Sequence, residues 1–489
     1  MIKNFKWLFL VAATFIACNS DDEVVQENNS SDGQPLTAGT ANFSKFISLG
    51  NSLTAGFSDN ALFIEGQKGS YTNILAQQFA QVGGGEFKIP FMADNVGGLL
   101  PTALGQFPRL VFYNGGPTSL ALPPFSQAST TTLTPLTGGF DNMGVPGAKS
   151  FHLLSTSYGN PAGIGTYANP YFVRFASNTS ASILGDALTR NHTFFSWWIG
   201  NNDVLSYATS GGTGTNQLGN LNPATYGSND ITDPTVFASV YNTLLDGTNG
   251  LTKNGAKGVV ANIPYVSSIP FFTTVPYNAV TLPLANATAL NAAYTAYNSG
   301  IAGAPITDEE KAKRTITFVE GKNALVIIDE SLTFLGPTVP KMRMATSKDL
   351  ILLSSGGVSA QAHIAAFNGI TSPLADNWVL TESEILEITT AVDAYNATIQ
   401  SLATSKGLAF VDANKLMQNV ASTGVSANGF TVKSTYVTGG GFSLDGVHPS
   451  PRGYALIANE FLKEINKTYG SNFKPVDLGN YRILFPSSL

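Results

Sequence analysis

Short apolar runs and amphipathic stretches alternate along the chain from about residue 43 onward. Uninterrupted apolar runs bounded by turn residues predict buried strands, and the clearest cover residues 46–49, 194–199, 258–262 and 408–411. Stretches with apolar residues every three or four positions predict helices, and the clearest cover residues 71–79, 234–244, 381–402 and 451–465. This alternation predicts an α/β fold in which helices cover both faces of a parallel sheet.

Several of these helices begin with capping patterns. Asp233-Pro234 and Ser450-Pro451 each place a capping side chain before a proline, and proline suits the first position of a helix. Thr381-x-x-Glu384 matches a capping box. Because a cap marks where a helix starts, these patterns also place the loops that precede the helices.

The chain has 489 residues, about twice what such a core needs. We therefore expect insertions near residues 80–140, 205–232 and 265–375. In the largest, residues 315–320 and 324–328 flank Gly321-Lys322-Asn323, which predicts a hairpin. The aromatic-rich start of this insertion, residues 270–277, either forms an acyl-binding wall or lid or packs as ordinary core, and core is the favoured interpretation.

The amino terminus has the pattern of an export signal. Lys3 and Lys6 precede an apolar stretch over residues 7–16, which is shorter than the roughly 20 residues that a transmembrane helix needs. The segment ends at Cys18, the only cysteine of the chain, so no disulfide can form within it. Residues 1–18 resemble a lipoprotein signal peptide with Cys18 lipidated, although Phe15 replaces the usual smaller aliphatic residue. An ordinary signal peptide is the alternative.

The acidic segment 19–23 resembles the surface-export signal of lipoproteins from the Bacteroidota. We therefore expect an outer-membrane lipoprotein that is exposed at the cell surface and attached to the membrane through its lipid anchor. Residues 19–41 are polar and predict a flexible tether.

Composition excludes several classes of function. The formal net charge is −6 and charged residues make up 12% of the chain, so nucleic acid is not an expected partner. No Walker A pattern, no Gly-x-Gly-x-x-Gly after a strand and no His-Glu-x-x-His occurs. We therefore expect no cofactor and no metal, and we expect a monomer.

Two widely separated segments carry candidate catalytic residues. Ser52 follows the first predicted strand, and a serine hydroxyl becomes a good nucleophile only when a base takes its proton. The chain has 4 histidines, and His448 alone has a partner at close spacing, Asp445. That carboxylate can accept from one imidazole nitrogen while the other nitrogen faces the serine. Asn202, after the aromatic strand at 194–199, offers an amide donor.

Each of these residues also has a structural interpretation. Taken alone, Ser52 fits a turn, and Asn202 fits a turn or a helix cap. Gly144 and Gly147 fit a glycine-rich turn. Residues expected to be structural are His152, His192, His363, Asp203, Asp329 and Asp412.

Taken in order, the segments 50–53, 142–147, 200–203 and 445–448 resemble the SGNH hydrolases, also called GDSL lipases or esterases. The resemblance implies a flavodoxin-like three-layer α/β/α sandwich over residues 42–470, with 471–489 as a C-terminal extension. It departs from the family at Asn51, where aspartate is usual. No Gly-x-Ser-x-Gly elbow is present, which argues against an ordinary α/β-hydrolase.

The resemblance also implies roles for individual residues. Ser52 would be the nucleophile, His448 the base and Asp445 its orienting acid. The oxyanion hole would consist of the backbone N–H groups of Ser52 and Gly147 and the amide of Asn202. The implied function is a surface-anchored carboxylic ester hydrolase that acts through an acyl-enzyme on a lipid or small ester.

Two alternatives remain open at this point. The first is an O-acetylesterase that acts on acetylated glycans, which a surface lipoprotein would meet. The second is a non-catalytic module that binds glycan or lipid at the cell surface.

Overall fold

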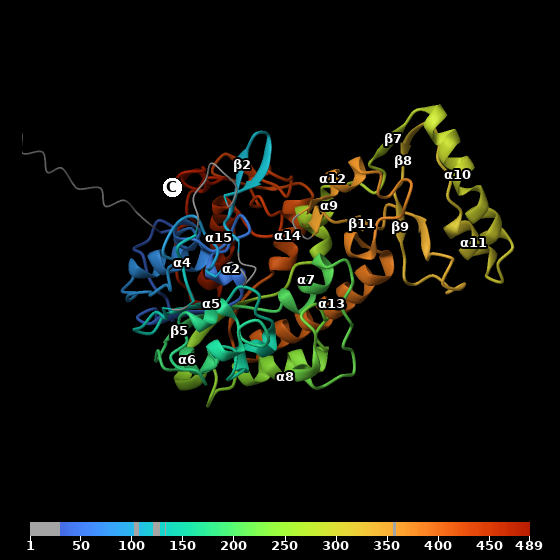
Figure 1. Ribbon diagram of the computed structural model, residues 1–489. Helices are drawn as coiled ribbons and strands as arrows, with labels where there is room; N and C mark the ends of the chain where they lie inside the picture. Colours follow the sequence, from blue (N-terminus) through green and yellow to red (C-terminus); the bar gives the residue numbers. More distant parts are fainter. Residues whose placement is uncertain (1–29, 102–106, 121–127, 133, 356–357) are drawn as a thin grey trace, which may run out of the picture.

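The computed structural model describes residues 30–101, 107–120, 128–132, 134–355 and 358–489 (Figure 1). At its centre lies a 5-stranded sheet made of β1 (Phe46–Gly50), β4 (Asn142–Gly144), β5 (Phe194–Trp198), β6 (Lys257–Ala261) and β15 (Ala409–Val411). All four neighbouring pairs are parallel. The order β15-β6-β5-β1-β4 corresponds to 2-1-3-4-5 along the chain, as in doubly wound sheets such as that of flavodoxin. The predicted α/β class with a parallel central sheet is confirmed.

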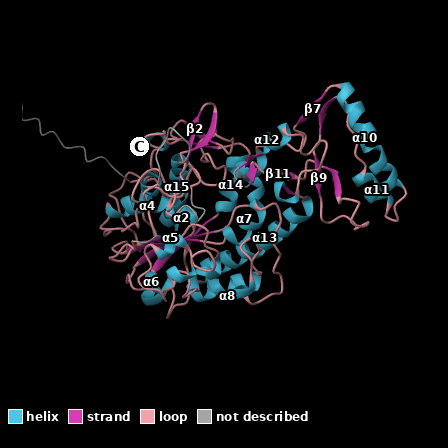
Figure 2. Cartoon of the chain, viewed as in Figure 1, coloured by secondary structure: helices cyan, strands magenta, loops and turns pink. Residues whose placement is uncertain are grey.

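Two adjacent tryptophans on β5 show that helices cover both faces of this sheet. Successive strand residues point to opposite faces. Trp198 contacts Tyr71 of α4 (Tyr71–Ala80) and Phe461 of α15 (Pro451–Tyr469), with ring centroids 5.8 and 6.0 Å away. Trp197 stacks on Tyr241 of α8 (Pro234–Leu244) at 3.9 Å. Helix α13 (Glu382–Ser405) lies beside α8 (Figure 2).

The predicted helix starts are present. Asp233 accepts from the backbone N–H groups at the start of α8, and Ser450 accepts from Gly453 at the start of α15. Thr381 and Glu384 form the capping box of α13. Substituting a capping side chain by alanine typically costs about 1 kcal/mol, so these residues stabilise the helices as well as marking their ends.

The largest insertion projects from the sheet domain at the right of Figure 1. Its elements are α9 (Pro270–Thr273), β7 (Val280–Leu282), α10 (Leu284–Ala302), α11 (Asp308–Arg314), β8 (Gly321–Asn323), β9 (Val326–Ile328), β10 (Met342–Met344), β11 (Leu350–Ile351), β12 (Ser354–Ser355), β13 (Val358–Ser359), α12 (Ala360–Ala365) and, after it, β14 (Val379–Leu380). Part of it has a hydrophobic cluster of its own, separate from the main core.

The hairpin predicted within this insertion is wrong. β8 pairs with β7 and β9 pairs with β10, both antiparallel. In the segment before β8, backbone N–H and C=O groups hydrogen-bond to asparagine side chains of α10 instead of to a neighbouring strand. Asn298 exchanges hydrogen bonds of 2.8 and 2.9 Å with the backbone of Ile316, and Asn291 does so with Phe318. Side-chain amides can replace a ladder in this way because each offers both a donor and an acceptor.

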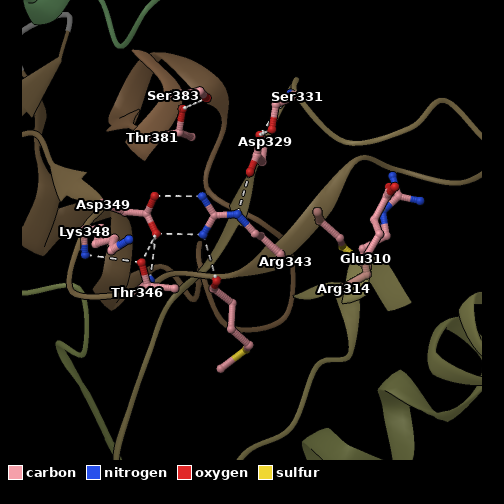
Figure 3. Close-up of polar contacts among 12 residues, drawn as sticks. Glu310, Arg314, Asp329, Ser331, Arg343, Thr346, Lys348, Asp349, Thr381 and Ser383 are labelled. Atoms are coloured by element: carbon pink, nitrogen blue, oxygen red, sulfur yellow. Dashed lines mark hydrogen bonds and ion pairs between the residues drawn. The ribbon is translucent and has the colours of Figure 1, made fainter. Parts of the chain in front are cut away.

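A buried ion network lies within the insertion (Figure 3). Arg343 donates two hydrogen bonds of 2.7 Å to Asp349 and one of 2.5 Å to Asp329. Burial alone would raise the pKa of Asp329, but hydrogen bonds from Ser331 and Arg343 hold it below its usual value. Asp329 therefore has the structural role that was predicted for it: it pairs with Arg343 on the neighbouring strand.

The chain near both ends packs against the sheet domain. Residues 30–41, where composition predicts a tether, hydrogen-bond to the segment after α15: Ser31 N donates to Asn472 O, and Thr37 N donates to Asn472 Oδ1. Near the C-terminus, Phe485 contacts Phe63 at 4.9 Å. The expected signal peptide, Cys18 and the first part of the tether lie outside the described residues.

The remaining elements are short. They comprise α2 (Ser52–Ala55), α3 (Ile64–Lys68), β2 (Leu110–Tyr113), β3 (Gly116–Ser119), α5 (Pro170–Val173), α6 (Ile183–Leu188), α7 (Asn202–Thr209), α14 (Ala413–Ala421), β16 (Val425–Ala427) and β17 (Phe430–Val432). Within the described ranges, none of the helices combines the length and the apolar character that crossing a bilayer requires.

Candidate active site

Ser52 sits at the start of α2, directly beyond the C-terminal end of β1. Asn51 caps this helix, with its side-chain oxygen accepting from the N–H of Leu53 at 3.0 Å. Gly50 is required for close packing, because a Cβ there would lie 2.4 Å from the carbonyl oxygen of Trp198. The tight exit from the strand holds the Ser52 side chain at the edge of the sheet, where open α/β sheets form their sites.

The structure brings the three predicted catalytic residues into one hydrogen-bonded chain. Ser52 Oγ lies 2.9 Å from His448 Nε2, and His448 Nδ1 lies 2.9 Å from Asp445 Oδ2. Ser52 and His448 are separated by 396 positions in the sequence. With the Nδ1 proton donated to the carboxylate, Nε2 is left as an acceptor for the serine hydroxyl.

The carboxylate of Asp445 is held from several sides. Its Oδ1 accepts from the backbone N–H groups of Val447 and His448, each at 2.8 Å. Its Oδ2 accepts from the N–H of Asn60 at 2.8 Å as well as from His448. Burial acts to raise the pKa of Asp445, but the His448 imidazole and the backbone N–H groups of His448 and Val447 lower it below its usual value. The group is therefore an anion suited to orienting the imidazole.

Asn202, one of the predicted oxyanion donors, lines the same cavity as Ser52. Asn202 is the first residue of α7 and donates from Nδ2 to the carbonyl of Ala148 at 2.9 Å. That bond ties it to the turn containing Gly147, whose φ of 81° lies in the left-handed region. Within the described part of the chain, the N–H groups of Ser52 and Gly147 have no hydrogen-bond acceptor. Both donors and the second N–H of Asn202 are thus available to a ligand.

The position of the site follows from the strand order. Ser52 follows β1 and Asn202 follows β5, and these strands are neighbours with Gly50 opposite Trp198. After β1 the chain forms β4 on one side of β1 and then crosses to form β5 on the other side. The site therefore occupies the switch point of the sheet, where crevices form at the carboxyl ends of the strands.

Asn51, at the position where the resemblance leads us to expect aspartate, has a side-chain hydrogen-bond partner in the structure. Asn51 Nδ2 donates to Asn201 Oδ1 at 3.1 Å, while its oxygen caps α2. An aspartate in the same geometry would place a negative oxygen against the amide oxygen of Asn201. Asparagine therefore suits this neighbour, and the exchange leaves the Ser52 hydroxyl untouched.

The residues expected to be structural have structural partners. Asp203 accepts from the N–H and hydroxyl of Ser150 at 2.8 and 2.6 Å, and burial raises its pKa. Asp412 caps α14. His152 stacks on a tyrosine ring, His192 bonds to a backbone carbonyl, and His363 contacts Trp378 and Asn368.

Sequence reasoning missed the turn at Asp59 and Asn60, which contacts Asp445. Both residues have positive φ, 50° and 64°. Asp59 N donates to Ser443 Oγ, and Leu444 N donates to Asp59 Oδ1, each at 2.9 Å. The only signal in the sequence is an Asp-Asn pair that favours a turn, and such pairs are common.

An apolar cavity of about 120 Å³ opens beside Ser52 and His448. Its walls come from the 263–269 loop, α14 and α15. Phe271 and Phe272 are buried and do not line it, which confirms the core interpretation for these two residues. The sequence did not single out α14 as a wall of the site.

Comparisons with models of protein families, with curated proteins and with solved structures yield no match for this chain. Among the described residues, no group of three or more His, Cys, Asp or Glu side chains is arranged to hold a metal ion.

Proposed function

We propose that the protein is a carboxylic ester hydrolase that acts through a serine acyl-enzyme. The observation that carries this proposal is the chain from Asp445 through His448 to Ser52, with both contacts at 2.9 Å. A structural serine has no need of an imidazole that is itself oriented by a buried carboxylate. The backbone N–H groups of Ser52 and Gly147 and the amide of Asn202 would supply the hydrogen-bond donors that an oxyanion needs in acyl transfer.

The residues have distinct roles in the proposed reaction. His448 Nε2 takes the Ser52 proton as Oγ attacks the ester carbonyl, and the oxyanion accepts from Ser52 N–H, Gly147 N–H and Asn202. The C–O bond to the alcohol then breaks, and His448 returns the proton to the leaving alcohol. Water, deprotonated by His448, attacks the acyl-enzyme, releases the acid and restores the Ser52 hydroxyl.

We assign the fold to the SGNH hydrolase type at the level of proposal. The strand order 2-1-3-4-5 supports it, as does the origin of the site in four segments that occur in the family order. We also propose that the chain is a surface-exposed outer-membrane lipoprotein, which the sequence around Cys18 supports. Metabolic labelling with palmitate tests the lipid anchor, and an unlabelled, globomycin-insensitive protein would refute it.

The ester hydrolase proposal is tested with p-nitrophenyl esters and a fluorophosphonate probe on the full chain and on Ser52→Ala. We expect hydrolysis and labelling in the wild type and loss of both in the variant. An exposed serine, Ser228→Ala, serves as the matched control. If neither simple esters nor acetylated glycans are cleaved and Ser52 is not labelled, the non-catalytic binding module becomes the better interpretation.

A further inference from the structure

Helix α14 presents its apolar face to the cavity beside Ser52. Ala413, Leu416, Met417 and Val420 recur at helical spacing, and all four line the cavity. Such a stripe normally packs on a neighbouring element. Here part of it borders empty space, which a well-packed interior rarely leaves.

The opposite walls are equally apolar. The cavity is completed by apolar side chains of the 263–269 loop, of residues 432–449 and of α15, together with Leu53, Trp198 and Leu205. The hydroxyl of Tyr265 is engaged by Asp393. The side walls therefore offer a ligand apolar surface to contact and almost no hydrogen-bond partner.

The polar residues of the lining are linked to one another. Ser52 hydrogen-bonds to His448 and its neighbour Asn51 to Asn201, which precedes Asn202. Among the apolar lining residues Leu53, next to Ser52, is half-buried, whereas Val420 and Val432 are buried. A ligand that matches this asymmetry has a single polar head at Ser52 and an alkyl tail that runs toward Val420.

We propose that this cavity is the acyl site of the enzyme and that it selects esters of unbranched fatty acids of about six carbons. The inference rests on the proposed function and narrows its substrate class. An apolar cavity of about 150 Å³ holds benzene, which has six carbons, and the cavity here has about 120 Å³. An acetyl group would leave most of it empty, and a much longer chain would have to leave through the open side.

The first test is the dependence of kcat/KM on acyl length in p-nitrophenyl esters from acetate to palmitate. Each methylene that enters an apolar site should raise kcat/KM about fourfold. We expect a rise from acetate to about hexanoate or octanoate and then a decline. A preference for acetate would overturn the acyl-site proposal while leaving the ester hydrolase intact.

Val420→Trp tests the location of the site. The indole would fill the buried end, so the ratio of hexanoate to acetate hydrolysis should fall at least tenfold. The matched control is Asn419→Trp, which adds the same side chain to the exposed face of α14 and should keep the wild-type ratio. An unchanged ratio in folded Val420→Trp would show that the chain binds elsewhere.

A second variant guards against misfolding of the first. Met417→Ala enlarges the cavity, so the optimum should move to longer esters by about two carbons. Titration of octanoate into Ser52→Ala by calorimetry provides a readout that needs no catalysis. Saturable binding that Val420→Trp or Met417→Ala alters supports the acyl site even if no ester is cleaved, whereas hydrolysis without octanoate binding and without a shift in optimum refutes it.

Discussion

The backbone N–H of Asn60 donates a 2.8 Å hydrogen bond to Asp445 Oδ2, the same oxygen that lies 2.9 Å from His448 Nδ1. Asn60 follows the helix that starts with Ser52, so this bond joins the segment that contains Ser52 to the segment that contains Asp445 and His448. Asp59 reinforces it through hydrogen bonds with Ser443 and Leu444. The distance between Ser52 and His448 is thus set by the turn as well as by the sheet.

Asp445→Asn should lower kcat by about 10⁴. The amide cannot accept from His448 Nδ1 and Asn60 N–H as a carboxylate does, so it favours the wrong imidazole tautomer. Steady-state kinetics with the best p-nitrophenyl ester measures the effect. The matched control is Asp308→Asn on an exposed helix, where the side chain is 99% accessible and kcat should not change. Full activity of Asp445→Asn would exclude this residue as the orienting acid.

Asn202→Ala should lower kcat by about 10²–10³, because one oxyanion donor is lost. It should leave KM nearly unchanged if the amide acts mainly on the transition state. Asn242→Ala, on the exposed side of α8, is the control. A rise in KM at constant kcat would instead make Asn202 a ground-state binding residue.

Asp59→Asn should change the pH dependence of stability. Burial raises the pKa of Asp59 to about 7, the charge of Asp445 adds to this, and the N–H of Leu444 and Arg109 oppose it. The folded state therefore binds more protons than the unfolded state between the ordinary value of 3.8 and about 7. Stability is lost as pH rises through this window, because the buried carboxylate must ionise.

The asparagine variant lacks this titration. From about pH 5 to pH 8 its free energy of unfolding should improve relative to wild type by about 2.5 kcal/mol. Urea unfolding at several pH values measures this difference. A difference that stays constant across the range would place the pKa of Asp59 near its ordinary value.

Arg343→Leu should destabilise the protein by about 3–5 kcal/mol, because Asp329 and Asp349 are left buried without their partner. Lys348→Leu is the control: its ion pair with Glu382 is exposed on both sides, at 66% and 60%, and should contribute less than about 1 kcal/mol. Figure 3 shows Arg343 between Asp329 and Asp349. Folded Arg343→Leu should still label at Ser52, since the site lies on the sheet domain. Equal losses in the two variants would contradict this ranking.

The local parts of the molecule could be predicted because they depend on neighbouring residues. The apolar runs of β1 and β5 and the caps at Asp233, Thr381 and Ser450 are set by side chains within a few positions. Asp445 and His448 could be paired for the same reason, since they are three residues apart.

Contacts across long separations could not be predicted in this way. The partner of β9 is decided by asparagines on α10 that occupy the backbone expected to pair with it. The hydrogen bond from Asn60 N–H to Asp445 joins residues 385 positions apart. The apolar residues of α14 recur with the same helical period whether they face the core or a cavity, so their spacing cannot tell the two apart. The sequence alone determined the elements and the types of catalytic group, because short-range sterics and hydrogen bonding act within each segment. Only the tertiary structure decided their distances, their partners and the empty space beside Ser52, because packing is a property of segments that meet in space.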